Sequence, residues 1–364
     1  MLKYLIIFLK ASYTIIPPKK NKILIYDRLS IKFAKVLFKK NSFITYDVRY
    51  ESINLFILFS TIIKYGFKNF RVFKKNYKYE YFESVKPKII YTSIDNNIGF
   101  FKLKHLYPKA LYVADQNGIR DNKFFNECKK YNRTNKSKKL YTDIFFCFGN
   151  NEKDRLNKVL KGSILPLGNT LNNSINVKKK FSKISSLFFI SSTSNIKTFL
   201  DRDIKIFKFL KSFCENKKIK LTFLEKPKRG NRYLFLKNIL KEDFNYIILD
   251  NKKTKEKIIK KNALFVFIIS TLGYEILSKG VKCVSLNHNQ FNHAFKKYRK
   301  KGPFWVDAPS YDYNHKLIST ALNKVINYNK LNWEKIYKHY SKQIMVYDKG
   351  NVIKLKNIKS RLGK

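Results

Sequence analysis

Acidic residues, glycine and proline are all scarce in this chain. Glycine occurs 12 times and proline 8 times in 364 residues, which excludes a collagen-like or linker-dominated protein. No apolar run approaches the roughly 18–20 residues that a membrane-spanning helix needs, so a polytopic membrane protein is also excluded. Aspartate and glutamate together number 25, against 77 lysines and arginines, which gives a net charge of +52.

Cysteine is also sparse, and the common catalytic motifs are missing. Cys128, Cys147, Cys214 and Cys283 lie far apart and form no C-x-x-C pair. Disulfide scaffolds and zinc sites are therefore disfavoured, and a reducing cytoplasm is expected. The sequence has no P-loop, no G-x-G-x-x-G fingerprint, no H-E-x-x-H and no G-x-S-x-G, which argues against the enzyme classes that use them.

The chain does contain ample core material and a large positive charge. Hydrophobic residues make up 44% of it, with 32 Phe and 24 Tyr, and its length predicts about two domains. Of the basic residues 66 are lysine, and the abundant residue types all have A- and T-rich codons, so genome composition accounts for much of the charge. The charge still attracts anionic lipids or substrates. Nucleic-acid binding is disfavoured because clustered arginines and recognition motifs are missing.

Short apolar runs alternate with amphipathic stretches, which is the pattern of βα units in a parallel sheet. The pattern stops at a polar stretch and then starts again. The sequence therefore predicts an α/β protein with two Rossmann-like domains facing each other across a cleft, followed by a C-terminal helical tail. The expected boundaries are 1–165 for the first domain, 166–182 for the linker, 183–330 for the second domain and 331–364 for the tail.

Two apolar segments near the N-terminus bear on membrane contact. The eleven residues Ile53–Ile63 are too short to span a bilayer, and we expect them to form a buried helix. The run Tyr4–Leu9 lacks a cleavage site, so an ordinary leading helix is expected, with contact to a membrane surface as the alternative.

The strongest candidate for ligand binding is the segment ALFVFIISTLGYEILSKGVKCVSL at residues 263–286. A strand is expected to end at Ser270, and a tight turn through Thr271 and Gly273 to open a helix. Small residues allow close backbone approach, and the start of a helix suits a phosphate. Glu275, one turn later, can accept hydrogen bonds from a sugar hydroxyl. The alternative is that Ser270 and Thr271 simply cap the helix.

Two polar turns follow neighbouring strands of the first domain, and both should point into the cleft. We expect Gly118 to take a positive φ that makes Gln116 and Asn117 hydrogen-bond donors, and Arg120 to pair with a phosphate. The alternative is turn capping by Asp and Asn. The candidate residues are Asp95 and Asn96 in the first turn, and Asp115, Gln116, Asn117, Gly118 and Arg120 in the second.

The segment STLGYEILSKGVKCVSL resembles the second domain of GT-B glycosyltransferases, and especially surface-carbohydrate biosynthesis proteins of that fold. The stretches PKIIYTSIDNN and ALYVADQNGIR resemble their first domain, and GPFWV, LNWEKIYKHY and YDKGN their C-terminal region. The resemblance covers residues 22–351. It implies transfer of a sugar from a nucleotide-activated donor to a glycan or lipid-linked acceptor. No metal or other cofactor is expected, because the helix dipole and basic side chains can neutralise the leaving diphosphate. The basic surface and the apolar leader would let such a cytoplasmic enzyme dock on the inner face of the cell membrane.

The resemblance further implies roles for the candidate residues. Glycosyl transfer with inversion needs a base for the acceptor hydroxyl, and Asp95 and Asp115 are the available carboxylates. Related polyol-phosphate transferases often carry His where Asn117 stands, and Asn is no base at neutral pH, so Asp95 is the preferred base. The donor nucleotide would contact Ser270, Thr271, Gly273, Glu275, Ser191, Ser192 and Thr193, and the acceptor side of the cleft would contain Asn96, Gln116, Asn117, Gly118 and Arg120.

Other functions remain open at this point. A polyol-phosphate transferase or a sugar-nucleotide epimerase could use the same fold. A non-catalytic basic protein that binds nucleic acid or an anionic membrane is the alternative from a different class.

Overall fold

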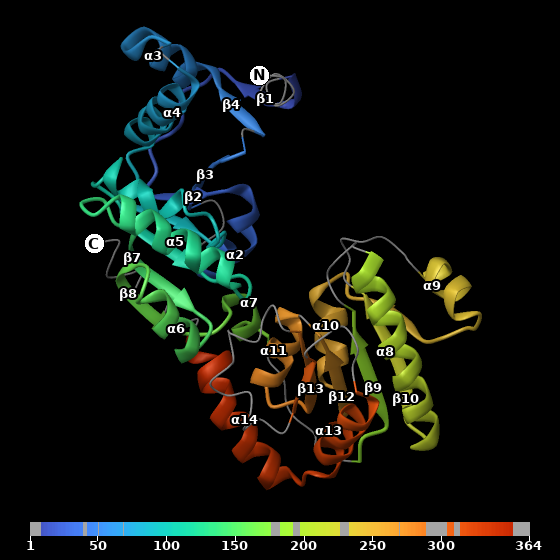
Figure 1. Cartoon of the computed structure of the whole chain (residues 1–364). Helices are drawn as coiled ribbons and strands as arrows, with labels where there is room; N and C mark the ends of the chain where they lie inside the picture. The colour runs from blue at the N-terminus through green and yellow to red at the C-terminus, as the bar shows by residue number, and fades with distance from the viewer. Residues whose placement is uncertain are drawn as a thin grey trace.

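The computed structural model describes residues 9–38, 42–49, 51–67, 69–175, 183–191, 197–225, 233–268, 270–288, 304–308 and 314–351. Within these residues the chain forms two large parallel β-sheets flanked by helices (Figure 1). This is the two-sheet α/β architecture that the alternating sequence pattern predicts.

The first sheet lies between residues 23 and 166, with strand order β3-β2-β5-β6-β7-β8 and every neighbouring pair parallel. The segments ILIY and IIYT are buried at every position, as expected for central strands covered on both faces. Its strands are β2 (Ile23–Tyr26), β3 (Ile44–Tyr46), β5 (Ile89–Thr92), β6 (Leu111–Asp115), β7 (Tyr141–Cys147) and β8 (Lys161–Pro166); its helices are η1 (Arg28–Ser30), α2 (Ile31–Leu37), η2 (Phe100–His105), α5 (Asn122–Thr134) and α6 (Asn150–Leu156).

The second sheet repeats the arrangement, with strand order β11-β10-β9-β12-β13-β14 and parallel pairing throughout. Strand β12 reads ALFVF and is fully buried at its centre. Its strands are β9 (Ser186–Ile190), β10 (Lys220–Glu225), β11 (Tyr246–Ile248), β12 (Ala263–Phe267), β13 (Cys283–His288) and β14 (Trp305–Ala308); its helices are α8 (Lys197–Asn216), α9 (Tyr233–Leu240), α10 (Lys252–Ile259), α11 (Thr271–Ser278) and α13 (His315–Asn327).

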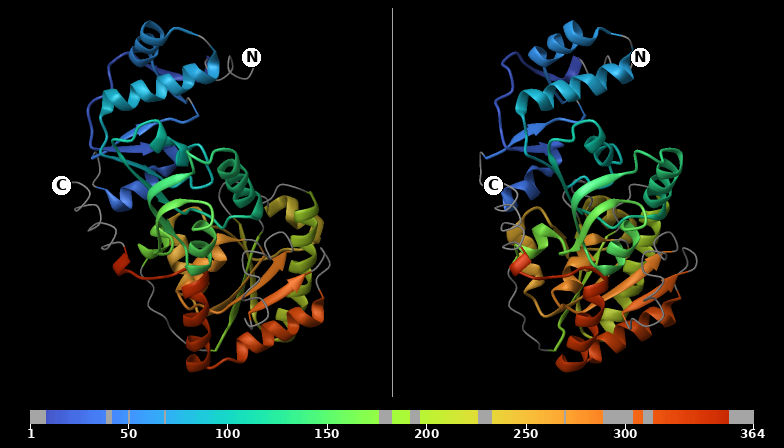
Figure 2. Two further views of the ribbon diagram at one scale, coloured as in Figure 1. Left: turned by 60° about the vertical axis from the view of Figure 1, so that its left-hand side comes forward. Right: turned by 90° about the vertical axis from the view of Figure 1, so that its left-hand side faces the viewer.

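A small extension projects from the first sheet, on the side away from the second sheet (Figures 1 and 2). Strands β1 (Ser12–Thr14) and β4 (Ser52–Asn54) pair in parallel there, and helices α3 (Leu55–Tyr65) and α4 (Phe70–Val85) pack on each other. The prediction of a helix within Ile53–Ile63 is confirmed by α3, but the prediction that it is buried is wrong, because α3 buries only Ile57 and Thr61. Beyond its contacts with α4, β1 and β4, most of its apolar side chains are left in solvent.

The chain crosses between the two halves twice. The first crossing follows β8 and begins with α7 (Thr170–Asn173), whose Thr170, Asn172 and Asn173 are buried. The second follows α14 (Lys330–Ile344), which packs against both α11 and α6 (Figure 2). After α14, the backbone N–H of Val346 donates to the carbonyl of Phe148 at 2.8 Å, so the tail returns to the first domain.

The core of the second domain explains the aromatic motif near the C-terminus. Trp333 of α14 is fully buried, and its indole N–H donates to the carbonyl of Gly280 at 2.9 Å. Phe304 and Trp305 make edge-to-face contacts with Tyr340 and are core residues. All four cysteines are buried free thiols.

Candidate functional site

The two predicted turns of the first domain leave the same edge of its sheet. Strands β5 and β6 are parallel neighbours with Thr92 paired to Ala114, so the residues that follow them start side by side. Across from this edge, β12 of the second sheet ends before Ser270 and α11 begins. The structure therefore brings the carboxyl ends of strands from both sheets to one junction.

Asp95 forms a buried ion pair with Arg120. The Arg120 Nε donates to Asp95 Oδ2 at 2.6 Å, and Nη2 pairs with Oδ1. The backbone N–H of Asn117 also donates to Oδ1, at 3.1 Å, and the Asn117 side-chain oxygen accepts from Arg120 Nη2 at 2.6 Å. Both oxygens of Asp95 are thus occupied, and its role in this arrangement is to orient the guanidinium.

Gly118 lies where the two domains approach. A β-carbon placed on it would be 3.5 Å from Arg120 Nη1 and 3.8 Å from the hydroxyl oxygen of Thr271. The predicted positive φ is wrong, because Gly118 is not among the positive-φ residues of the structure. The absence of a side chain instead leaves room beside a cation from one domain and a hydroxyl from the other.

The start of α11 offers unpaired polar groups at this junction. Ser270 occupies the N-cap position without a side-chain capping bond, so capping does not explain this serine. Its hydroxyl is buried and has no hydrogen-bond partner within the described residues. The first N–H groups of a helix have no intrahelical acceptor, and the dipole there favours an anion. Thr271 is partly exposed beside them.

The other residues predicted to bind the donor nucleotide make contacts within the protein. A β-carbon on Gly273 would lie 2.2 Å from the ring of Phe267, so this glycine lets α11 pack closely on β12. Glu275 is buried and ion-paired with Lys255 of α10. Ser191 is buried and donates to Glu225 at 3.1 Å. Ser192 and Thr193 lie outside the described residues.

Asp115 has neutral partners, in contrast to Asp95. The hydroxyls of Tyr91 and Thr170 donate to its Oδ2 at 3.0 and 2.5 Å. Its Oδ1 is buried without a partner within the described residues. Burial raises the pKa of Asp115 to about 7, although the two hydroxyls lower it, and the negative charge of Asp95 adds to the rise.

Gln116 and Asn96 do not have the positions in the cleft that the sequence predicts. Gln116 is fully buried: its amide nitrogen donates to Gly118 O at 2.9 Å, and its oxygen accepts from Phe148 N at 2.8 Å. It therefore holds the turn to the end of β7. Asn96 is exposed, and no hydrogen bond of its side chain is found within the described residues.

Sequence reasoning missed the residues that join the two domains. Asn172 donates to the backbone oxygen of Glu275 at 3.3 Å and to the Ser278 hydroxyl at 3.0 Å. Lys279, at the end of α11, donates to the carbonyls of Asn172 and Ile175 at 2.8 and 2.9 Å. Burial lowers the pKa of Lys279 to about 7. The asparagines after Gly168 lie in the segment predicted as the linker, and they are the sequence signal for these contacts.

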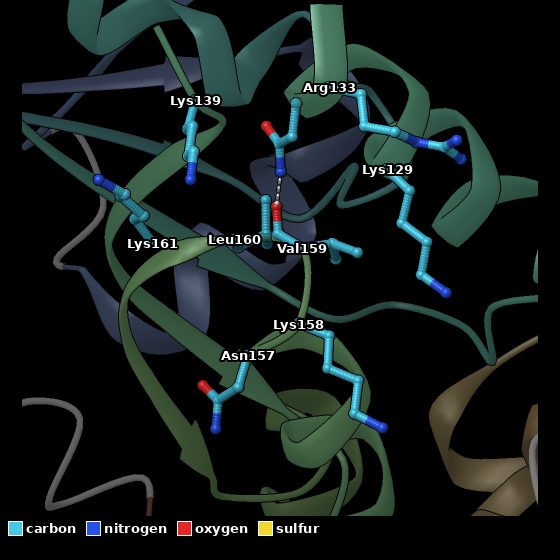
Figure 3. A pocket seen from close by; sticks show the side chains of 9 residues that line it. Lys129, Arg133, Lys139, Asn157, Lys158, Val159, Leu160 and Lys161 are labelled. Carbon is cyan, nitrogen blue, oxygen red and sulfur yellow. Dashed lines mark hydrogen bonds between the residues drawn. The ribbon is translucent and has the colours of Figure 1, made fainter. Parts of the chain in front are cut away.

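A separate basic hollow lies at the opposite edge of the first sheet (Figure 3). Its volume is about 640 Å³, and Asn132 donates to Val159 O inside it at 2.7 Å. Lys139 precedes β7 and Lys161 begins β8, so the hollow is at the amino ends of these strands and is not part of the junction. Its basic lining consists of Lys129, Arg133, Lys139, Lys158 and Lys161.

The described residues contain neither a candidate metal site nor a candidate membrane-spanning helix. No three His, Cys, Asp or Glu side chains gather there as a set of metal ligands. No helix in these ranges has the length and apolar character needed to cross a membrane.

The fold is that of GT-B-like α/β proteins, and similar solved structures span nearly the whole chain. The UDP complex of MnaA from S. aureus has a TM-score of 0.53 and 13% identity, covering 95% of this chain and 97% of that one. A UDP-N-acetylglucosamine 2-epimerase has a TM-score of 0.55 and 12% identity, with coverage of 95% and 97%. Spinosyn rhamnosyltransferase SpnG with thymidine diphosphate has a TM-score of 0.55 and 8% identity, with coverage of 93% and 100%. At these identities the likeness establishes the fold.

Residues 113–361 match the family described as "putative O-antigen biosynthesis protein". The match spans more than half of the chain, and the protein belongs to this family. Its place is therefore in surface-carbohydrate biosynthesis, as the sequence resemblance implied. No curated protein matches the chain. The matched region includes the Asp115–Arg120 turn and the Ser270–Glu275 turn, whereas Asp95 lies before it.

Proposed function

We propose that the protein is a glycosyltransferase that binds a nucleotide-activated sugar at the junction of its two domains and transfers the sugar to a glycan or lipid-linked acceptor. The observation that carries this proposal is the approach of Arg120 to Thr271. The Nη1 of Arg120 and the Thr271 hydroxyl both lie within 4 Å of one point beside Gly118. A diphosphate there would contact a guanidinium from one domain and a helix N-terminus from the other.

The arrangement suits a leaving nucleoside diphosphate. Charge builds up on the diphosphate as the glycosidic bond to it breaks, and pre-oriented donors stabilise that charge. Arg120 is held in place by Asp95 and Asn117, so little side-chain reorganisation is needed when the ligand binds. The buried hydroxyl of Ser270 supplies a further donor that the protein itself leaves unused. These groups can neutralise the diphosphate without a metal ion.

We propose Asp115 as the base that takes the proton of the acceptor hydroxyl. Its pKa of about 7 lies near the working pH, which suits general-base catalysis. Asp95 is the weaker candidate, because Arg120 and the Asn117 N–H already occupy both of its oxygens. Both carboxylates are fully buried. An acceptor can therefore reach Asp115 only when the strand ends of the two sheets move apart at the junction.

Thermal denaturation with a panel of nucleotides tests donor binding. UDP, GDP, CDP, dTDP, CMP and their sugar conjugates are compared at moderate salt, which suppresses non-specific binding to the basic surface. A ligand that binds only the native state raises the melting temperature. We expect a rise for one base, abolished by Thr271→Trp and retained in Thr320→Trp, an exposed position on α13. No rise with any nucleotide would contradict the proposal.

An epimerase is the second candidate, because the fold matches a solved epimerase over nearly the full length of both chains. The same diphosphate site would serve both reactions. Incubation of the preferred nucleotide sugar without acceptor separates them. A new sugar epimer still attached to the nucleotide indicates an epimerase, whereas nucleotide release that depends on an added acceptor indicates a transferase.

A further inference from the structure

Helix α3 presents an apolar face to solvent at the far end of the molecule. Ile63 is 83% exposed, Phe59 is 59% exposed and Phe56 is 48% exposed. Residues 56, 59 and 63 follow helical spacing, so they form one stripe along the helix. Ile15, which follows β1, is 75% exposed and joins them in lining a pocket of about 440 Å³.

Polar side chains join α3 to α4. Tyr65, Lys64 and Ser60 donate to the buried carboxylate of Glu80 on α4 at 2.8, 2.6 and 3.4 Å. Thr61 is buried and donates to the carbonyl of Ile57 at 2.7 Å. A helix of a soluble domain normally places its apolar stripe on the core. In α3 the larger apolar side chains point away from the protein instead.

The position of α3 separates its apolar face from the second domain. Figures 1 and 2 show α3 and α4 beyond the first sheet, on the opposite side from the second sheet. The apolar face therefore does not belong to the domain junction. Contiguous exposed apolar patches of this kind mark interaction surfaces.

The charges around the patch identify the partner. Between Ile53 and Tyr79 the sequence has no Asp or Glu and six basic residues, and the next residue, Glu80, is buried and paired with Lys64. Lys64 lines the pocket, and Arg71 and Lys75 of α4 are exposed. A second copy of a chain with a net charge of +52 would place like charges against each other, whereas anionic phospholipid head groups complement them.

We propose that the α3 face docks on an anionic lipid bilayer, with Phe56, Phe59 and Ile63 entering the boundary between head groups and acyl chains. The exposed basic residues Arg71 and Lys75 of α4 contact the lipid phosphates. An amphipathic helix lying in the interface combines these two contributions. The docking helix is part of the folded first domain, and its function does not depend on nucleotide binding at the junction.

Vesicle co-sedimentation of the full chain tests this proposal. Vesicles of phosphatidylcholine alone are compared with mixtures containing phosphatidylglycerol, at low and high salt. We expect binding to the anionic vesicles, weakened by salt, and a loss of about tenfold or more in Phe59→Ser/Ile63→Ser. The matched control is Leu317→Ser/Leu331→Ser, which removes exposed apolar side chains from α13 and α14. Equal vesicle binding by wild type and the α3 variant would overturn the proposal.

A fluorescence measurement tests the same proposal without relying on the double variant. Trp305 and Trp333 are buried, so a new tryptophan at position 59 is distinguishable by its exposure. We expect the emission of Phe59→Trp to shift to shorter wavelength on anionic vesicles. Emission that stays at the wavelength of a water-exposed indole would overturn the proposal. So would a change from dimer to monomer in Phe59→Ser/Ile63→Ser without any effect on vesicle binding, because the face would then be a contact between copies.

Discussion

Asp95 follows β5 and Asp115 ends the neighbouring strand β6, yet the surroundings of the two carboxylates are opposite. Asp95 accepts hydrogen bonds from the guanidinium of Arg120 and from the backbone N–H of Asn117. Asp115 faces two neutral hydroxyls and leaves one buried oxygen unpartnered within the described residues, and burial brings its pKa to about 7. The two carboxylates thus lie at the same edge of the sheet but differ in role. Asp95 holds the Arg120 cation, and Asp115 can exchange a proton near neutral pH.

The largest effect is expected when the Asp95 charge is removed. Asp95→Asn leaves Arg120 without its counter-ion in a buried setting, and breaking such a pair costs about 3 kcal/mol in the free energy of unfolding. Urea denaturation at pH 8 measures the loss. In the double variant Asp95→Asn/Arg120→Met the loss should be smaller than the sum of the single losses, because the pair is already broken. Additive losses would show that the two side chains do not act as a unit.

Asp115→Asn is expected to have the opposite sign at the same pH. The native carboxyl holds its proton up to about pH 7, whereas the unfolded carboxyl loses it near its usual value of 3.8. The unfolded state therefore binds fewer protons in this window, and stability falls as the pH rises from about 4 to 7. Asparagine does not titrate, so the gain of the variant over wild type should be larger at pH 8 than at pH 5, by roughly 2 to 3 kcal/mol.

Urea denaturation of wild type and Asp115→Asn at several pH values checks this sign. Lys279 contributes above that window: its lowered pKa of about 7 makes stability rise from pH 7 toward 10.5 in both proteins, so it cancels in the comparison. A loss of stability at pH 8 in Asp115→Asn would mean that the carboxyl is charged and well solvated in the native state.

Thr170→Val should give the smallest effect. It removes one of the two hydroxyl donors to Asp115, at a cost of about 1 kcal/mol that is greater at pH 8, where the carboxylate is charged, than at pH 5. Thr142→Val is the matched control, because the Thr142 hydroxyl is equally buried and donates to the carbonyl of Tyr112. The same pH dependence in both variants would remove Asp115 as the cause.

The sequence located the ends of the relevant strands but not the partners of the residues that follow them. Buried parallel strands are short apolar runs, so β5, β6 and β12 could be recognised and the polar turns after them predicted. The pairing of Asp95 with Arg120 depends on how two turns fold beside each other. The contact between Asp115 and Thr170 spans 55 residues and requires α7 to pack across the sheet edge. No local pattern encodes such contacts.

For the apolar segment Ile53–Ile63, the sequence likewise does not predict which side chains are buried. Its composition correctly predicts a helix, because long apolar side chains tolerate that conformation. Composition cannot say which face meets the protein, and here the polar contacts to Glu80 decide it. An apolar run that leaves one face in solvent looks the same in sequence as one in the core.

Calorimetric titration of the preferred nucleoside diphosphate into Asp95→Asn and Asp115→Asn tests the division of roles most directly. Both variants remove one carboxylate charge from neighbouring strands and keep the side-chain shape. The account predicts that Asp95→Asn weakens binding about tenfold or more, because Arg120 loses its orientation, while Asp115→Asn binds as wild type does and loses turnover. Equal affinities in the two variants, or a loss confined to Asp115→Asn, would contradict it.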